Sequence, residues 1–368
     1  MRDEHKQWLL ELTALPTAAG REQRVIEWVR RWAGQRPAVE LTADAFGNLT
    51  LLHRNRGSDR PIYFEAHMDH PSFVVSAVQE RSAQAVFRGG VEASYFPGTA
   101  VLLHHDGVEP QRGRVAEGPL TETATKDIGV TVNFDHPVTA GPGDVLMWDV
   151  GPQRVENGRL FTPACDDLAG VAAALSAFDV LLREPGPGVA GDIRVLLTRA
   201  EEVGFVGAIA ACIAGTIPHS ARIIALENSK SFAESPIGGG PIVRVGDKTT
   251  TFDADLTYRV GKIAEAIAAA DPDFKWQRKL MPGGTCEASA FGAYGYTATC
   301  LCNPLGNYHN MNTDTGRIEA ETISLSDHAG LIRLLVEVGR QLDDPAKSPN
   351  LKSRLDDLFA KRRYLVES

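Results

Sequence analysis

The chain has 368 residues, 43% of them hydrophobic, and a formal net charge of −9. This size is enough for a large core and a second domain, and the acidic balance excludes the basic footprint of a nucleic-acid-binding protein. Its five cysteines lack a CxxC pair and do not form a disulfide framework. No apolar run is long enough to span a membrane, and MRDEHKQWLLEL lacks the pattern of a signal peptide. We therefore expect a soluble cytoplasmic protein with free thiols and no nucleic-acid or membrane partner.

The N-terminal part predicts helices followed by a β-hairpin. Apolar residues recur at helical spacing between residues 3 and 34, with PTAAG as a break. VELTADAFGNLTLLHR then alternates like a hairpin with FGN at its turn. PIYFEAHMDH is a short apolar strand that ends in polar residues.

The pattern of apolar and turn residues changes between residues 73 and 162. Short β-type runs are separated there by glycine and proline turns, and no convincing helix interrupts them. This pattern predicts a small all-β domain. The most economical interpretation is one α/β domain, residues 1–72 and 163–368, interrupted in sequence by an all-β insertion at residues 73–162.

Helices and strands alternate after the insertion, which predicts an α/β sheet. The predicted helices cover residues 168–184 and 205–214, and the predicted strands cover residues 193–199 and 221–227. SLSDHAGLIRLLVEVGRQL is a capped amphipathic helix. Beyond it an apolar stripe at Leu351, Leu355, Leu358 and Phe359 predicts a further helix. That helix either docks on the core or forms a subunit contact.

Five stretches place ligand-type side chains where a strand is expected to end. In open α/β sheets this edge is where sites are built. The stretches are EAHMDH with His67 and Asp69, TPACDDLAG with Asp166 and Asp167, TRAEEVGFVGA with Glu201 and Glu202, ARIIALENS with Glu227, and NPLGNYHN with His309. Each alone has an ordinary explanation as a helix cap, a solvated strand end or a polar loop.

Together these stretches form a nitrogen and oxygen ligand set that suits two zinc ions, or manganese or cobalt, and not a thiolate site. The adjacent pair Glu201 and Glu202 then has an explanation. Two divalent ions would outweigh the three carboxylates of Asp166, Glu202 and Glu227, so Glu201 could stay ionised beside Glu202. If Glu202 binds a metal, Glu201 is free to act as general base on a metal-activated water.

The same motifs resemble the tetrahedral, or glutamyl, aminopeptidase family of the dinuclear zinc exopeptidase clan. The resemblance runs through nearly the whole chain in DAFGNLTL, AHMDH, CDDLAG, EEVGFVGA, GGGPIVR, GGTCEASAF and NYHN. It implies an α/β fold, with a mixed sheet that carries helices on both faces, interrupted by a small all-β domain that serves dimerisation or larger assembly. It also implies a peptide substrate and a homo-oligomer, and no organic cofactor.

The resemblance implies a role for each of seven residues: His67 and His309 each bind one metal ion, Asp166 bridges the two ions, Glu202 and Glu227 each complete one ion, Glu201 is the general base, and Asp69 orients His67. The reaction implied is metal-assisted hydrolysis that removes N-terminal residues from peptides. Glu201 takes a proton from the attacking water and returns it to the leaving amine. Two zinc ions are the expected cofactors, with cobalt or manganese as alternatives.

The chain departs from the family pattern at two places. Ser72 stands where the family usually has glycine, and His70 and Pro71 are unusual, so we expect the floor of the site to differ. Glu227 stands where the family usually has aspartate, which resembles the carboxypeptidase and deacylase branches of the clan. A carboxypeptidase or an N-acyl amino acid deacylase is therefore the alternative function.

Three further interpretations stay open at this point. A binding or scaffold protein that has lost activity is disfavoured by the complete ligand set. A glycosidase would need two carboxylates and no metal. In GGTCEASAF, the Gly-rich turn places Thr285 or Glu287 near the substrate or simply opens a helix, while Cys165 and Cys286 are expected to be buried core residues.

Overall fold

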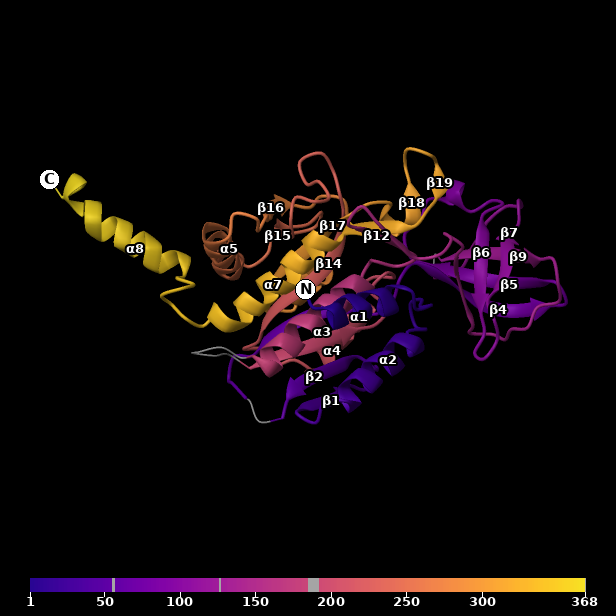
Figure 1. Ribbon diagram of the computed structural model, residues 1–368, viewed down its shortest axis with the longest axis horizontal. Helices are drawn as coiled ribbons and strands as arrows, with labels where there is room; N and C mark the ends of the chain where they lie inside the picture. The colour runs from indigo at the N-terminus through magenta and orange to yellow at the C-terminus, as the bar shows by residue number, and fades with distance from the viewer. Residues whose placement is uncertain (55–56, 126, 185–191, 368) are drawn as a thin grey trace.

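The computed structural model describes residues 1–54, 57–125, 127–184 and 192–367. An α/β body occupies the middle of the molecule, a β-rich part lies at one end, and a single C-terminal helix projects from the other end (Figure 1). No helix among the described residues is both long enough and apolar enough to cross a membrane. All five cysteines are free, as expected, and all are buried, including Cys165 and Cys286 for which burial was predicted.

The body is built on one eight-stranded mixed sheet. In spatial order its strands are β1 (Val39–Ala43), β2 (Leu49–His53), β13 (Ile193–Thr198), β3 (Ile62–His67), β14 (Arg222–Lys230), β17 (Thr297–Leu305), β15 (Ile242–Gly246) and β16 (Gln277–Leu280). The four central strands, β13, β3, β14 and β17, run parallel to one another. Their carboxyl ends therefore meet at one edge, which is the edge where the predicted ligands were expected.

Helices cover both faces of this sheet, because its central strands are apolar on both sides. In β3, Ile62 and Phe64 belong to one buried cluster while Tyr63 belongs to another, as the two-residue period of a strand requires. The first cluster draws on α1 (Asp3–Thr13), α2 (Gln23–Gly34), α3 (Leu168–Arg183), α5 (Ala254–Ala270) and α7 (Leu325–Gln341). The second draws on α4 (Val206–Ala214) and α6 (Glu287–Ala293). The mixed α/β fold predicted from the sequence is confirmed.

The stretch predicted to be all-β forms a seven-stranded sheet that closes on itself. Its strands are β4 (Ser72–Gln79), β5 (Ser82–Arg88), β6 (Ala100–His104), β7 (Gln111–Val115), β8 (Thr121–Glu122), β9 (Ile128–Phe134) and β10 (Val145–Trp148), with a single 3-10 turn at η1 (Ala93–Tyr95). Pairing of β5 with β9 makes the sheet barrel-like. Aromatic rings fill its interior; those of Phe73 and Trp148 lie edge to face with centroids 4.7 Å apart.

The last two strands of that stretch belong to a different sheet. β11 (Arg154–Glu156) and β12 (Arg159–Thr162) form a separate three-stranded sheet with β20 (Glu321–Ser324), which lies far away in sequence. The last residues assigned to the insertion thus pair with a strand of the later chain, which ties the exit of the insertion to the body. The domain limits at residues 73 and 162 themselves stay a prediction.

The predicted strand at residues 221–227 is longer than expected. β14 continues to Lys230 because β17 pairs with it along its whole length, from Arg222 opposite Thr297 to Lys230 opposite Leu305. Glu227 therefore lies inside a strand, opposite Cys302, and not at the end of one. The predicted position at a strand end was wrong for this residue, although its side chain still reaches the site described below.

The C-terminal segments complete the chain. After β17 come η2 (Tyr308–Asn310) and the small hairpin of β18 (Met311–Asn312) and β19 (Arg317–Ile318). α8 (Leu351–Arg362), followed by the 3-10 turn η3 (Arg363–Leu365), contains no buried residue. The predicted apolar stripe is indeed helical, but Leu355 and Phe359 are 54% and 62% exposed. Docking of this stripe on the core was therefore wrong, and a subunit contact stays a prediction.

Candidate metal centre

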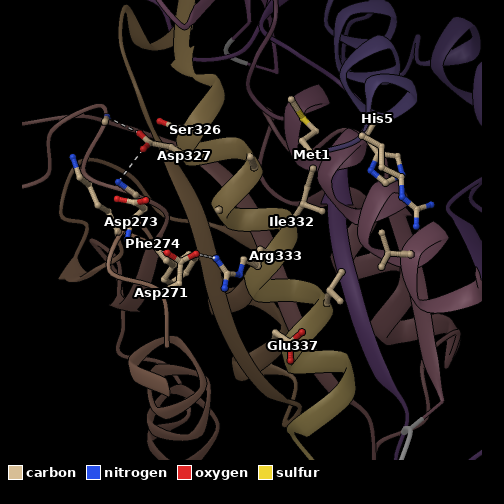
Figure 2. Close-up of a pocket in the computed structure, with 18 of the residues that line it drawn as sticks. Met1, His5, Asp271, Asp273, Phe274, Ser326, Asp327, Ile332, Arg333 and Glu337 are labelled. Carbon is tan, nitrogen blue, oxygen red and sulfur yellow. Dashed lines mark hydrogen bonds and ion pairs between the residues drawn. The ribbon is translucent and has the colours of Figure 1, made fainter. Parts of the chain in front are cut away.

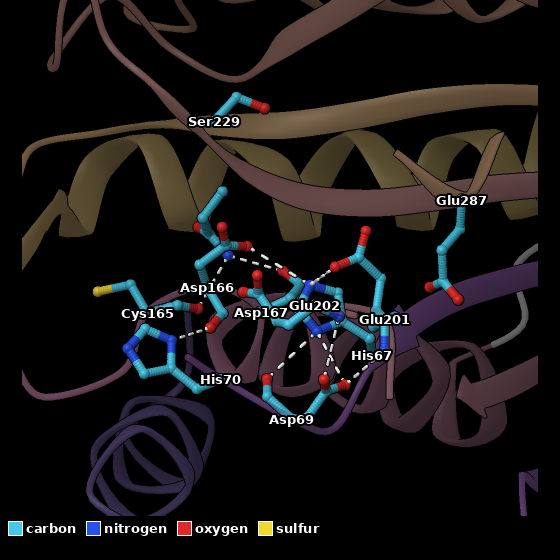
Figure 3. A network of polar contacts seen from close by, with 12 residues as sticks. His67, Asp69, His70, Cys165, Asp166, Asp167, Glu201, Glu202, Ser229 and Glu287 are labelled. Carbon is cyan, nitrogen blue, oxygen red and sulfur yellow. Dashed lines mark hydrogen bonds and ion pairs between the residues drawn. The ribbon is translucent and has the colours of Figure 1, made fainter. Parts of the chain in front are cut away.

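Four loops bring the predicted site residues to the carboxyl edge of the sheet. β3 ends at His67, β13 ends three residues before Glu201, Asp166 precedes α3, and His309 lies in η2 after β17. Figure 3 shows the side chains of His67, Asp69, Asp166, Glu201 and Glu202 converging from these loops. Segments separated by as much as 240 residues along the chain are in direct contact here, as the His70–Asn310 pair shows.

The five predicted ligands and the predicted base Glu201 fall into two groups of three, each with ligand-type atoms within 4.8 Å of one another. One group is His67, Glu201 and Glu227, and the other is Asp166, Glu202 and His309. Within the second group, the Nε2 atom of His309 lies 3.4 Å from a carboxylate oxygen of Glu202. These are separations that an ion placed between such atoms can span.

Asp166 belongs to the second group but faces a histidine of each group. Its Oδ1 atom is 3.6 Å from Nε2 of His67, and its Oδ2 atom is 3.8 Å from Nε2 of His309. One carboxylate thus presents one oxygen to each histidine. This is the arrangement by which a carboxylate can bridge two ions.

Asp69 connects His67 to the loop that carries the glutamate pair. Its two carboxylate oxygens accept hydrogen bonds from the backbone N–H groups of Glu201 at 3.0 Å and Glu202 at 3.1 Å. The Nδ1 atom of His67 lies 3.2 Å from the carbonyl oxygen of Asp69 and 3.5 Å from its carboxylate. These acceptors favour a proton on Nδ1, which leaves Nε2 free to bind an ion.

His309 is held with its Nε2 atom toward the site in the same way. Its Nδ1 atom lies 2.6 Å from the carbonyl oxygen of Gly90, just beyond β5 of the seven-stranded sheet. The backbone of His309 is left-handed, with φ of 55°, as are those of Asn307 and Asn310. Non-glycine residues adopt this conformation only where surrounding contacts impose it. The loop is therefore shaped by its partners and not by local preference.

Burial and mutual repulsion make it unfavourable for all the carboxylates of the centre to be charged without a nearby positive charge. Burial, reinforced by the neighbouring carboxylates, raises the pKa of Glu202 and Glu227 well above the ordinary value, and burial does the same for the pKa of Glu201. Burial works to lower the pKa of His67, but Glu201, Asp166 and Asp69 together raise it well above its usual range. Burial lowers the pKa of His309 to about 4, so that its ring is neutral and available as a ligand.

The residues fit a pair of divalent cations. Among the described residues, the buried oxygens Oδ1 of Asp166 and Oε1 of Glu202 have no hydrogen-bond partner, and a buried acceptor without a partner is costly. Two imidazole nitrogens and several carboxylate oxygens form the donor set that zinc, cobalt and manganese share. The arrangement can therefore hold two metal ions and keep a carboxylate, Glu201, beside them.

Two supporting residues were missed by sequence reasoning. Glu321 accepts hydrogen bonds from the backbone N–H groups of Cys165, Asp166 and His309, and His70 contacts both Asp166 and Asn310. The only available signal for His70 was its place beside the HxD motif in a departure from the family pattern. Glu321 gave no signal, because it lies in a short strand outside every motif.

The two alternatives raised for GGTCEASAF are separated by the structure. Glu287 is buried beneath the site, where its carboxylate shares the hydroxyl of Thr198 with Glu65 at 2.9 Å and 3.0 Å. It opens α6 and does not line a cavity among those described next. Thr285 lies instead in a small cavity beside Glu227, together with Arg244 and Tyr308.

Two larger cavities differ in their relation to the centre. One of about 550 Å³ borders Glu202 and is lined by Arg88 and Gly89 on one side and Val206 on the other. Another of about 800 Å³ lies along α7, between Arg333 and Glu337 on that helix and Met1 and His5 near the N-terminus (Figure 2). This second cavity includes none of the seven predicted site residues.

Comparison with known proteins gives a consistent result. The model of the M42 glutamyl aminopeptidase family matches residues 47–323. No curated protein matches the sequence.

Among solved structures, the TET1 peptidase of Pyrococcus horikoshii is 22% identical, with a TM-score of 0.74 over 92% of this chain and 99% of that one. A TET aminopeptidase from Thaumarchaeota archaeon SCGC AB-539-E09 is 19% identical, with a TM-score of 0.75 over 94% and 99% of the two chains. An aminopeptidase from Desulfurococcus kamchatkensis is 20% identical, with a TM-score of 0.74 over 94% and 98%. At these identities the likeness shows a shared fold.

Proposed function

The chain belongs to the M42 glutamyl aminopeptidase family and is a metal-dependent aminopeptidase, and we propose that its centre is dinuclear with Glu201 as the general base. The proposed ligands are His67 and Glu227 for one ion, His309 and Glu202 for the other, and Asp166 as the bridge. The observation that carries this proposal is the position of Asp166, which turns one oxygen toward each histidine. Zinc is the proposed metal, and cobalt and manganese suit the same donors.

Bound metal ions supply the Lewis acid that polarises the scissile carbonyl and lowers the pKa of the attacking water. Glu201 takes the proton of that water at its carboxylate and returns it to the leaving amine. Its Oε2 atom lies 3.7 Å from Nε2 of His67, in the same group of neighbouring ligand-type atoms as His67 and Glu227. Asp69 holds the backbone of Glu201 in place while the carboxylate exchanges the proton.

A buried arginine supports a preference for acidic N-terminal residues, in keeping with the glutamyl activity that names the family. Arg244 is 3% exposed and lines the same small cavity as Glu227, Thr285 and Tyr308. Its Nη1 atom donates to the hydroxyl of Ser229 at 3.1 Å, but its Nε atom has no partner and no carboxylate pairs with it among the described residues. A substrate carboxylate would supply the missing charge-assisted hydrogen bonds.

We also propose that the chain forms a homo-oligomer through the all-β part at residues 73–162. The TET1 peptidase of Pyrococcus horikoshii can assemble into a tetrahedron or a large octahedral shell, and a second TET1 structure contains a dodecamer. The structural likeness to these proteins covers 91% and 92% of this chain, more than the α/β body alone. Mass photometry of the purified protein would measure the assembly directly.

The test of the function is mass spectrometry of the products from a defined peptide mixture with free and acetylated N-termini. Zinc-loaded enzyme is expected to shorten only the free peptides, from the N-terminus, and a chelator is expected to stop the reaction. Loss of residues from the C-terminus, or release of the acyl group alone, would instead favour the carboxypeptidase or deacylase alternative that Glu227 raised.

A further inference from the structure

The backbone of Asp166 is held at both of its polar groups by buried side chains. Oε2 of Glu321 accepts hydrogen bonds from the N–H groups of Asp166 at 3.0 Å and of Cys165 at 2.7 Å. On the other side, Nδ1 of His70 lies 2.5 Å from the carbonyl oxygen of Asp166. The peptide units on either side of the proposed bridging residue therefore each have a side-chain partner that comes from elsewhere in the chain.

The same two side chains also hold the loop of His309. Oε1 of Glu321 accepts a hydrogen bond from the N–H group of His309 at 2.8 Å. Nε2 of His70 lies 3.0 Å from Oδ1 of Asn310. The amide of Asn310 donates through Nδ2 to the carbonyl oxygens of Pro163 at 2.9 Å and Glu319 at 3.2 Å, which fixes the orientation that turns its oxygen toward His70.

His70 and Glu321 thus each span the same two segments, residues 165–166 and residues 309–310. Both are fully buried, with 0% exposure. They come from different elements, His70 from the turn between β3 and β4 and Glu321 from the start of β20. Two independent bridges between the same segments restrict both their separation and their rotation, which a single bridge would leave free.

We propose that His70 and Glu321 form a clamp that sets the position of Asp166 relative to His309, and so shapes one of the two ion sites before metal binds. The proposal rests on the dinuclear centre proposed above. Both are positioning residues, because each acts through backbone or amide groups of the ligand loops. The backbone of His309 is left-handed, and that conformation persists only when other contacts impose it. The clamp supplies such contacts.

The clamp predicts a selective loss of metal affinity. Removal of a group that orients a metal ligand typically weakens metal affinity by about 10–100-fold. Because the clamp holds Asp166 and His309, the ion shared by Asp166, Glu202 and His309 should be weakened most. The ion at His67 and Glu227 should change less, since Asp166 is the only one of its proposed ligands that the clamp contacts through the hydrogen bonds described above.

The experiment is a Zn²⁺ titration of metal-free full-length protein against a fluorescent chelator, which yields two successive dissociation constants. The variants are His70→Asn, which keeps a donor near the Asp166 carbonyl but cannot reach Asn310, and Glu321→Gln, which keeps the size but replaces an acceptor by a donor. The controls are His136→Asn and Glu122→Gln, at exposed positions in and beside the seven-stranded sheet. Thermal unfolding of every metal-free protein is measured in parallel.

We expect each clamp variant to weaken one dissociation constant by about 10–100-fold and to leave the other within about threefold. The double variant should lose less than the product of the two single losses, because both residues act on the same segments. His70→Gln, which reaches Asn310 but not the Asp166 carbonyl, replaces His70→Asn if that variant does not fold. The controls should bind both ions as the wild type does.

Other outcomes would overturn the clamp. Variants that bind both ions as tightly as the wild type, or that lose both equally, contradict it, even if the metal-free protein melts at a lower temperature. A wild type that binds only one ion overturns the dinuclear centre and the clamp together. If the wild type binds two ions and the variants bind both ions as tightly, the clamp alone is overturned and the dinuclear centre stands.

Discussion

A carboxylate oxygen of Asp69 accepts a hydrogen bond from the backbone N–H group of Glu201 at 3.0 Å. The residue expected only to orient His67 therefore also fixes the loop that carries the proposed base. Its second oxygen holds the N–H group of Glu202 in the same way. One side chain thus sets the positions of two proposed ligands, His67 and Glu202, and the proposed base Glu201 relative to one another.

Replacement of Asp69 should reveal this double role. In Asp69→Asn the amide NH₂ must face the ring of His67 or one of the two backbone N–H groups, and each of these contacts needs an acceptor. We expect kcat/KM to fall about 10–100-fold, with a smaller zinc content after dialysis. Steady-state kinetics and elemental analysis of the same preparation measure both effects. Wild-type zinc content together with wild-type kcat/KM would contradict the assignment.

The adjacent glutamates should separate into a base and a ligand. Glu201→Gln is expected to lower kcat by about 10²–10⁴-fold, the usual contribution of a general base, while the protein still binds two zinc ions. Glu202→Gln makes the same chemical change at the neighbouring position and serves as the matched variant. It should lose one zinc ion. Zinc stoichiometry and kcat are measured for both. Loss of metal from Glu201→Gln with full retention in Glu202→Gln would reverse the two roles.

Arg244 should control the preference for the N-terminal residue. Arg244→Leu removes the buried guanidinium, and we expect kcat/KM for a peptide that begins with glutamate to fall about 10–100-fold, as expected for the loss of about one or two charge-assisted hydrogen bonds. The value for an otherwise identical peptide that begins with glutamine should change little. The ratio of the two kcat/KM values is the measurement. An equal loss for both peptides would assign Arg244 a structural role only.

His328 predicts a specific dependence of stability on pH. This residue of α7 is fully buried, neither ring nitrogen has a hydrogen-bond partner among the described residues, and burial lowers its pKa to about 3. As the pH falls through about 6.5, His328 of the unfolded chain binds a proton, whereas His328 of the native protein stays neutral. The free energy of unfolding is therefore not reduced by this residue's titration above that pH and decreases as the pH falls below it. His328→Leu removes this penalty and two unpaired polar atoms.

We expect His328→Leu to be more stable than the wild type at neutral pH by about 1–3 kcal/mol. Its advantage should grow by about 1.4 kcal/mol between about pH 7.5 and about pH 5.5. Urea unfolding of both proteins in the presence of a chelator measures the difference, because the acidic centre is common to both. A difference that stays constant with pH would show that His328 has the same pKa in the native protein as in the unfolded chain.

The sequence predicted the parts of the centre that leave a local pattern. His67, Glu201 and Glu202 follow apolar runs that form buried parallel strands, so an apolar segment followed by polar residues located them. Glu321 and His70 could not be assigned roles in this way. Their partners are backbone groups and the side-chain amide of Asn310, between 12 and 240 residues away along the chain, and no periodicity or spacing records such a contact.

The C-terminal helix shows a second limit of sequence reasoning. The spacing of Leu351, Leu355, Leu358 and Phe359 correctly predicted α8, because helical periodicity is a local property. It did not predict what covers the stripe, because that depends on the direction of the chain after α7. Residues 343–350 lead α8 away from the body (Figure 1), so the stripe faces solvent in the single chain.

The hydrogen bond between Nδ1 of His309 and the carbonyl oxygen of Gly90 spans 2.6 Å. It means that the two parts of this protein are not interchangeable modules. A trimmed variant that excised the seven-stranded sheet to obtain a minimal peptidase would also discard the acceptor that sets the tautomer of His309 in the proposed metal centre. Any graft of this insertion onto a related body would have to reproduce that one carbonyl, whatever surface it offers to neighbouring subunits.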